Sequence, residues 1–405
     1  MSEGIDSIPD GGVTSPRGFL AGAARVGVRP DSEKLDLGVL YAEAECAAAG
    51  VYTRNQVKAA PVLITRKHLA SGHARAVIAN SGCANAATGE KGLSDAVEMA
   101  RLAGAKLGID PHEVVVASTG VIGTFLPMDR IRGGVDRVVL SDGGGADFAR
   151  AIMTTDTRPK QVAVRVGGYV VGGVAKGAGM IHPNMATMLC FLTTDAPVAP
   201  ALLAASLTEA VDASFNMIDI DSDTSTNDMV VVMANGLAGG DGIGAGGPGA
   251  AAFATALTAV CTHLAKAMAA DAEGGTKLIE ARVEGARSAA DARAAAREVV
   301  RSLAVKTAVY GHDPNWGRIL AAVGNSGAEM SEGRTALYLA SPDGAEVCLF
   351  RDGSPQPYDP AQARACLLPR EVRIRVDLGF GDAAATAWGS DLTEEYVRLN
   401  SQYTT

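Results

Sequence analysis

The sequence predicts a mixed α/β protein in which short buried strands alternate with helices. Residues 76–80 and 114–117 are short apolar runs followed by turns that contain Ser and Gly, a pattern typical of buried strands. Between them, residues 91–107 carry apolar side chains at helical spacing and charged side chains on the other face. Hydrophobic residues make up 47% of the chain but aromatic residues only 4%, so we expect a core of Ala, Val, Leu and Ile.

The rest of the chain continues this alternation. Residues 162–175 alternate in polarity around Gly167 and Gly168, which predicts a β-hairpin. Further strands are expected at 189–194 and 229–235, helices at 200–214, 250–270 and 289–303, and a tail from residue 334 with short strands and one helix at 360–366.

The length of 405 residues exceeds one typical domain. We expect a disordered lead over residues 1–17, a main domain over 18–272 and a smaller C-terminal α/β domain over 273–405. The lead has no basic region followed by an apolar run, so it does not read as a secretory signal.

Composition argues against several classes of protein. The net charge of −9 disfavours nucleic acid or an anionic membrane as a partner, because phosphate binding needs clustered Lys and Arg. The six Cys and six His show neither CxxC nor metal spacing, so we expect reduced thiols and no metal site. The apolar run at 250–260 is too short to cross a membrane, and we expect a cytoplasmic protein.

A glycine-rich segment, residues 236–249, contains a formal GxGxxG at Gly242, Gly244 and Gly247. A dinucleotide-binding loop would need a strand leading into it, a helix opening after it and an acidic residue about 20 positions later. Pro248 and Gly249 stand where the helix should open. We therefore favour a surface loop over a nucleotide-cofactor site.

Thr187 is the residue with the most distinctive chemistry. A Thr hydroxyl is a weak nucleophile, but cutting the Ala186–Thr187 bond would free an α-amine beside it on the same residue. That amine has a pKa of about 7.7–8.0, so it can act as a base near neutral pH. If Thr187 is considered alone, an ordinary buried strand residue is the better interpretation. The sequence around it favours the nucleophile instead.

Eight blocks in order along the chain resemble the ornithine acetyltransferases (glutamate N-acetyltransferases) of arginine biosynthesis. The resemblance covers roughly residues 18–405, and residues 176–197 resemble the family's cleavage site. The blocks are 52–63, 80–89, 117–123, 153–160, 221–228, 273–279, 305–318 and 395–405.

The resemblance implies an αββα layered sandwich of the N-terminal-nucleophile type with the smaller C-terminal α/β domain. It also implies self-cleavage at Ala186–Thr187 into an α-chain of residues 1–186 and a β-chain of residues 187–405. Thr187 would then carry acetyl from N-acetylornithine to glutamate, without a cofactor or metal. An assembly of two cleaved protomers is implied, and acetyl-CoA is left open as a second acetyl donor.

The family's other site residues match positions of this chain. An oxyanion needs aimed donors, and the resemblance assigns that role to Thr119 and Gly120, which otherwise read as a plain turn. Lys176 would hold the substrate α-carboxylate rather than lie on the surface. The remaining substrate contacts implied by the resemblance are Thr154, Glu273, Asn400 and Thr405.

Other interpretations stay open at this point. A same-fold aminopeptidase or amidase would share Thr187 and the oxyanion donors but pass the acyl group to water. The blocks at 221–228 and 313–318 have no assigned role, and tight turns with buried hydrogen bonds are the simplest prediction. Cys190 is either a reactive thiol or, as we favour, a buried small hydrophobic residue.

Overall fold

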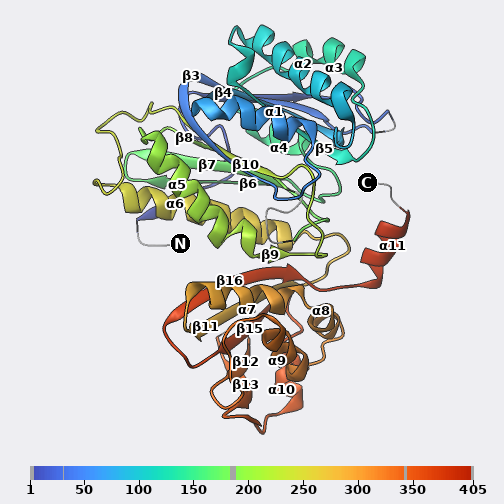
Figure 1. Ribbon diagram of the computed structural model, residues 1–405, viewed down its shortest axis with the longest axis vertical. Coiled ribbons are helices and arrows are strands. Elements are labelled where there is room, and N and C mark those ends of the chain that lie inside the picture. The colour runs from blue at the N-terminus through green and yellow to red at the C-terminus, as the bar shows by residue number, and fades with distance from the viewer. Residues whose placement is uncertain (1–3, 31, 183–187, 342–343, 403–405) are drawn as a thin grey trace.

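The computed structural model describes residues 4–30, 32–182, 188–341 and 344–402. Within them the chain forms two β-sheets with flanking helices (Figure 1). The first sheet and its helices fill the upper part of Figure 1, and the second sheet with helices α7 to α10 fills the lower part. The C-terminal helix α11 leaves the second sheet and returns to the first part of the molecule.

The first sheet runs in the order β1-β6-β7-β8-β10-β3-β4-β5, with β2 paired to β3. Neighbours are antiparallel except for the parallel pairs β8–β10 and β4–β5. Its strands are β1 (Ile5–Ile8), β2 (Phe19–Ala24), β3 (Leu37–Tyr52), β4 (His73–Cys83), β5 (Val114–Val121), β6 (Lys160–Val166), β7 (Tyr169–Lys176), β8 (Leu189–Thr194) and β10 (Met229–Ala234).

Alternating side chains of these strands build three separate cores, which give the αββα layering. In β10, Met229 and Val231 face a central core shared with β3, β4 and β5. The intervening Val230 and Val232 face an outer core with helices α5 (Pro200–Ala213) and α6 (Ala250–Ala269). Because successive side chains of a strand point to opposite faces of the sheet, one apolar strand packs against the central core on one face and the outer core on the other.

The opposite outer core lies between β3–β5 and helices α2 (Gly89–Leu107) and α3 (Met128–Gly134). Helix α1 (Ala60–His68) packs beside α2, and α4 (Gly145–Ala151) places Phe148 in the central core. Gly108 caps the C-terminus of helix α2, and its φ of 68° is the left-handed conformation that favours glycine. The predicted αββα sandwich is therefore confirmed.

The second sheet runs in the order β14-β13-β12-β15-β11-β16-β9. Its strands are β9 (Ile218–Asp219), β11 (Leu278–Ala286), β12 (Ala336–Ala340), β13 (Glu346–Arg351), β14 (Ser354–Pro355), β15 (Glu371–Asp377) and β16 (Ala383–Ser390). Its helices are α7 (Ala289–Arg301), α8 (Leu303–Tyr310), α9 (Trp316–Asn325) and α10 (Pro360–Ala365), and the last helix of the chain is α11 (Glu394–Gln402).

The structure changes two of the sequence expectations and leaves a third as a prediction. The prediction that residues 1–17 are disordered is wrong for the described residues 4–17, because β1 pairs with β6 and Val13 is fully buried. The helix expected over 289–303 ends at Arg301, where Ser302 caps a new helix by accepting the N–H of Val305. The domain division at 272 stays a prediction; β9, from before it, lies in the second sheet.

Helix α6 is long and apolar enough to cross a membrane by length and composition alone. In the fold its apolar side chains instead pack in the outer core of the first sheet, for example Phe253, Leu257 and Leu264. Core helices pass the same length and composition test, so α6 is evidence for packing rather than for a membrane span.

Candidate active site

An inner cavity of about 110 Å³ lies where the carboxyl end of β7, the end of β5, the loop before β11 and helix α11 meet. Six of the predicted site residues line it. They are Thr119, Gly120, Thr154, Lys176, Glu273 and Asn400. Segments that lie far apart in the sequence thus converge on one site.

Lys176 forms the cationic wall of this cavity. It is the last residue of β7 and is 2% exposed, so the surface-lysine interpretation is wrong. Its Nζ donates a hydrogen bond to Thr119 Oγ1 at 3.2 Å. Burial lowers the pKa of Lys176, and the carboxylate of Asp156 opposes that shift. The lysine is therefore a desolvated cation whose charge is supported by nearby carboxylates.

Asp156 holds the surroundings of Lys176 in place. Its carboxylate accepts the Gly177 N–H at 2.7 Å and the Thr154 N–H at 3.0 Å, and it pairs with Lys160 at 2.6 Å. Burial alone would raise the pKa of Asp156, but Lys176 and Lys160 outweigh it and hold the pKa at about 2. Asp156 therefore stays ionised and fixes the backbone on both sides of the cavity.

Gly120 occupies a position that only glycine fits. Its φ is 131°, and a Cβ there would lie 2.4 Å from the carbonyl carbon of Gly82 on β4. The parallel pairing of β4 and β5 brings the two glycines together at a register irregularity. Backbone of β5 can therefore reach the cavity at Thr119–Gly120 without a side chain in the way.

The opposite wall is acidic and is completed by helix α11. Asn400 on α11 donates its Nδ2 to Glu273 Oε2 at 2.9 Å, and the Glu273 N–H binds the carbonyl of Ala178. A Cβ at Gly274 would lie 2.4 Å from the backbone nitrogen of Tyr396, so the helix packs directly on this loop. The C-terminal segment is a docked helix through residue 402 rather than a frayed tail.

Asp221 also lines the acidic wall and was not predicted as a site residue. Its Oδ2 accepts the Met180 N–H at 2.5 Å and the Tyr396 hydroxyl at 3.2 Å, and its Oδ1 accepts the Ile181 N–H at 2.8 Å. Burial raises the pKa of Asp221 to about 6, against these donors. The only sequence signal was its place in the 221–228 block.

Asp228, at the other end of that block, lies next to the start of β8. Its Oδ1 accepts the N–H of Met188 at 2.9 Å, and its Oδ2 has no hydrogen-bond partner in the described part of the chain. Burial raises the pKa of this carboxyl well above its usual range. The buried hydrogen bonds expected for the 221–228 block are therefore present, and Asp221, Asp223, Ser225 and Asn227 of the block line the inner cavity.

Ala186, Thr187 and Thr405 lie outside the described residues. The chain next to Thr187 is nevertheless placed, because Leu189 pairs with Lys176 in the β7–β8 ladder. The six described site residues and this ladder therefore belong to one region. Sequence reasoning missed Asp156, Asp221 and Tyr396, although each lies inside a block that resembles the family.

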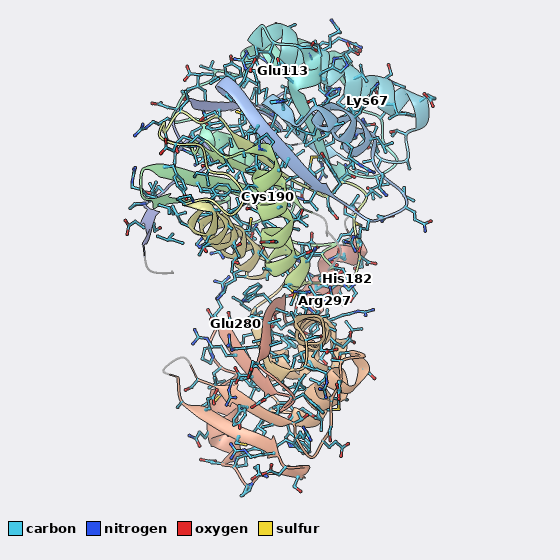
Figure 2. All side chains as sticks on the ribbon, turned by 60° about the vertical axis from the view of Figure 1, so that its left-hand side comes forward. Lys67, Glu113, His182, Cys190, Glu280 and Arg297 are labelled. Carbon is cyan, nitrogen blue, oxygen red and sulfur yellow. The ribbon has the colours of Figure 1, made fainter. Side chains whose placement is uncertain are left out.

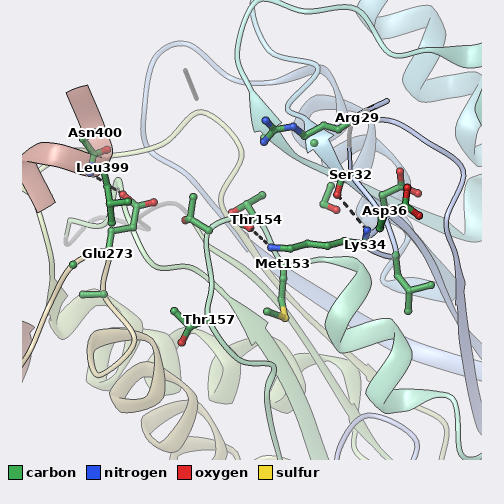
Figure 3. Close-up of a pocket in the computed structure, with 18 residues that line it drawn as sticks. Arg29, Ser32, Lys34, Asp36, Met153, Thr154, Thr157, Glu273, Leu399 and Asn400 are labelled. Atoms are coloured by element: carbon green, nitrogen blue, oxygen red, sulfur yellow. Dashed lines mark hydrogen bonds between the residues drawn. The ribbon is translucent and has the colours of Figure 1, made fainter. Parts of the chain in front are cut away.

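An outer cleft of about 680 Å³ adjoins the inner cavity and shares Gly120, Thr154 and Glu273 with it. Figure 3 shows Glu273 and Asn400 on one side of the cleft and Arg29 and Lys34 on the other. Among the described residues, no group of three or more His, Cys, Asp or Glu side chains is arranged to hold a metal ion.

Cys190 and His182 lie near the cleavage segment in the sequence. Cys190, labelled in Figure 2, is fully buried in the outer core, and burial raises the pKa of its thiol well above the usual range. The buried-residue interpretation is therefore confirmed. His182 binds Asp219 at 2.8 Å through Nδ1, and Asp219 also pairs with the buried Lys306.

Comparison with known proteins matches this chain to a family model described as the ArgJ family over residues 20–405. A relative from Symbiobacterium thermophilum named arginine biosynthesis bifunctional protein ArgJ is 54% identical over 98% of this chain and 99% of its own length. The protein of the same name from Bacillus subtilis is 45% identical over 98% of this chain and 97% of its own length.

Two solved structures with similar sequences each cover less than half of this chain. The ArgJ structure from Bacillus halodurans is 44% identical with a TM-score of 0.43 and covers 45% of this chain and 98% of its own. An ornithine acetyltransferase from Mycobacterium tuberculosis, complexed with ornithine, is 45% identical with a TM-score of 0.43 and covers 44% and 98%.

Proposed function

Because this chain belongs to the ArgJ family and is an ornithine acetyltransferase of arginine biosynthesis, we propose that it carries acetyl from N-acetylornithine to glutamate on Thr187. One observation supports this most directly. Six predicted site residues line one cavity, and the strand that follows Thr187 is paired with the strand that ends in Lys176. Family membership favours acetyl transfer over the aminopeptidase and nucleotide-binding alternatives.

Self-cleavage creates the nucleophile in this proposal. Thr187 Oγ attacks the carbonyl carbon of Ala186, the Ala186–Thr187 C–N bond breaks, and an ester forms in its place. Water hydrolyses the ester, which leaves a carboxylate on Ala186 and a free α-amine on Thr187. That amine lies beside the hydroxyl and takes its proton in the next reaction.

Acetyl transfer then uses the same hydroxyl twice. Thr187 Oγ attacks the acetyl carbonyl of N-acetylornithine, and ornithine leaves with the proton as its α-amine is released. The α-amine of glutamate attacks the acetyl ester, N-acetylglutamate departs, and the Thr187 hydroxyl is restored. Splitting one amide exchange into two steps avoids direct attack of one amine on another amine's amide.

The Lys176–Thr119 hydrogen bond supports the oxyanion assignment. Since Lys176 Nζ donates to Thr119 Oγ1, that oxygen accepts, and the Thr119 hydroxyl proton remains available for another acceptor. Thr119 and the Gly120 N–H would together stabilise the tetrahedral oxyanion. Lys176 Nζ has further N–H groups for the substrate α-carboxylate, while Thr154, Asn400 and Thr405 would contact the rest of the substrate.

Glu273 and the other carboxylates of the acidic wall would pair with the side-chain ammonium of ornithine. The ornithine bound by the relative from Mycobacterium tuberculosis fits this assignment of the leaving product. We carry the remaining expectations as part of the proposal: no cofactor, an assembly of two α- and two β-chains, and a cytoplasmic location. Acetyl-CoA stays in the proposal as a second donor, which the size of the outer cleft favours.

The experiment is mass spectrometry of the purified protein before and after mixing with N-acetylornithine. We expect two chains of 186 and 219 residues (405 − 186 = 219), with the second beginning at Thr187 and gaining one acetyl group. Thr187→Ala should remain a single chain and transfer no acetyl. A wild-type protein that stays uncut, or that transfers acetyl without an acetylated second chain, would contradict the proposal.

A further inference from the structure

The proposed reaction requires one site to bind ornithine, whose side chain is positively charged, and glutamate, whose side chain is negatively charged. In ornithine the side-chain nitrogen is the fourth atom from Cα, and in glutamate the carboxylate oxygens are also the fourth atoms from Cα. If both molecules anchor their α-carboxylate and α-amine in the same way, the ammonium of one and the carboxylate of the other reach the same place. A fixed charge at that place would favour one partner and repel the other.

The described lining residues of the inner cavity carry more negative than positive charge, which favours the ornithine side chain over that of glutamate. Lys176 is its single cation, and the proposed function uses Lys176 for the α-carboxylate. The other charged lining residues are Asp221, Asp223 and Glu273. These carboxylates suit an ornithine ammonium, but ionised together they would repel the side chain of glutamate.

Tyr396 and Asp221 face each other on this acidic wall. Both line the cavity, and the Tyr396 hydroxyl lies 3.2 Å from Asp221 Oδ2. The backbone N–H groups of Met180 and Ile181 hold the Asp221 carboxylate, while the Tyr396 N–H binds Thr393 Oγ1. A tyrosine hydroxyl is both a donor and an acceptor, so its direction depends on whether the carboxyl beside it carries a proton.

We propose that Asp221 and Tyr396 form a proton switch that lets one cavity bind side chains of either charge, an inference that rests on the proposed function. With Asp221 ionised, Tyr396 donates its proton to Asp221 and turns its lone pair toward the ornithine ammonium. With Asp221 protonated, Asp221 donates to the Tyr396 oxygen, and the Tyr396 hydroxyl donates to the glutamate carboxylate. Solvent supplies one proton as glutamate enters and receives it again when the product leaves.

The electrostatic surroundings bring this proton within reach of neutral pH. Burial, reinforced by Asp219, raises the pKa of Asp221 to about 6. The Tyr396 phenol stays protonated, because its own pKa is raised by burial and by Asp221 and Glu273. The charged or titratable groups that face the pair are Asp219 on β9, Asp223 on the same loop, Glu273 before β11 and Lys306 on α8.

The sign of the pH dependence follows from these groups. Lys306 favours the ionised form of Asp221, whereas the carboxylates and an entering glutamate favour the protonated form. Glutamate should therefore be accepted best at low pH, and its use should decline as Asp221 loses its proton. Deacetylation of N-acetylornithine should instead become faster as Asp221 loses its proton, because the ornithine ammonium is attracted to the ionised carboxylate.

The test measures the two half-reactions separately between about pH 5.5 and pH 8.5, a range that spans the shifted carboxyl. Single-turnover mixing with N-acetylornithine reports acetylation of the second chain, and mixing the acetylated enzyme with glutamate reports its loss. The readout is the ratio of the two kcat/KM values, with the glutamate value expressed per concentration of glutamate whose α-amine is unprotonated. Titration of the Thr187 α-amine affects both half-reactions and cancels, and this correction removes the titration of the attacking glutamate α-amine, which N-acetylornithine lacks. We expect the ratio of glutamate use to N-acetylornithine use to fall with rising pH, by up to about tenfold per unit.

Asp221→Asn and Tyr396→Phe are the variants, with Asp241→Asn in the exposed glycine-rich loop as the matched control. The Asn side chain can donate to Tyr396 as the protonated carboxyl would. Asp221→Asn should therefore keep the glutamate half-reaction, lose about ten- to hundredfold in the N-acetylornithine half-reaction, and show a flat ratio against pH. Tyr396→Phe should weaken both half-reactions, and the control should match the parent.

A parent ratio that does not change with pH would overturn the switch. So would an Asp221→Asn variant in which both half-reactions fall equally. If that variant fails to fold, the parent ratio and Tyr396→Phe still decide. Failure of the proposed function is a distinct result, since it appears in the parent as a second chain that never becomes acetylated.

Discussion

The two walls of the inner cavity are built in different ways. The cationic wall belongs to the first sheet: Lys176 and Thr119 sit at strand ends, are almost completely buried and bind each other directly. The acidic wall is closed by α11, which follows the second sheet and has no fully buried residue of its own. Its links to the body include Asn400–Glu273 and Tyr396–Asp221.

The two walls therefore suit different tasks, oxyanion stabilisation for the cationic wall and substrate binding for the acidic wall. Strand ends in a close-packed sheet hold donors at fixed positions, which the proposed oxyanion chemistry requires. A helix docked through a few hydrogen bonds positions less rigidly, but it can adjust to substrates of different charge. Self-cleavage should therefore depend on the strand wall alone, and substrate use on both walls.

The largest effect expected is that of Gly120→Ala on the strand wall. The new Cβ would lie 2.4 Å from the Gly82 carbonyl carbon, and backbone at φ 131° resists any side chain. Displacing the Gly120 N–H should lower acetyl transfer by about 10²–10³-fold, the usual effect of losing one oxyanion donor. Steady-state rates with a melting curve as a folding check measure it; parent-like transfer would remove Gly120 from the oxyanion assignment.

Deleting residues 402–405 should have an intermediate effect. The deletion removes Thr405 and shortens α11 while leaving Asn400 and Tyr396 in the chain. We expect self-cleavage to proceed, since it needs only groups near Thr187, and acetyl transfer to fall about ten- to hundredfold from loss of hydrogen bonds to charged groups. A denaturing gel and the coupled assay measure the two steps, and equal transfer by both proteins would show that the tail plays no part.

Gly274→Ala should have the smallest effect and is the matched partner of Gly120→Ala. Its Cβ would approach the Tyr396 nitrogen to the same 2.4 Å, but the obstacle is a docked helix that can shift outward. We expect cleavage at the parental rate and a rise in KM of about tenfold or less, with little change in kcat. If the two alanine variants lose activity equally, the acidic wall is as rigid as the cationic one and the comparison fails.

Much of the fold could be predicted from the sequence, because apolar runs and helical spacing are patterns within single strands and helices. The continuous apolar run at Met229–Ala234 and the helical spacing over residues 91–107 became β10 and α2 almost residue for residue. The lead escaped prediction because the four residues of β1 are ordered by pairing with β6, more than 150 residues away, and carry no periodicity of their own. The 16-residue β3 was not predicted either, since its Ala-rich run lacks the usual β-branched residues.

The kind of chemistry can be inferred from the amino-acid sequence: a threonine at a bond flanked by family blocks, glycines where backbone must come close, and a set of candidate donors. Which polar groups come into contact depends on the three-dimensional fold. Lys176 and Thr119 are 57 residues apart, and Tyr396 and Asp221 are 175 apart, so no local pattern records either contact. Burial then sets the pKa of Asp221, because desolvation depends on everything packed around a group and not on its neighbours in the chain.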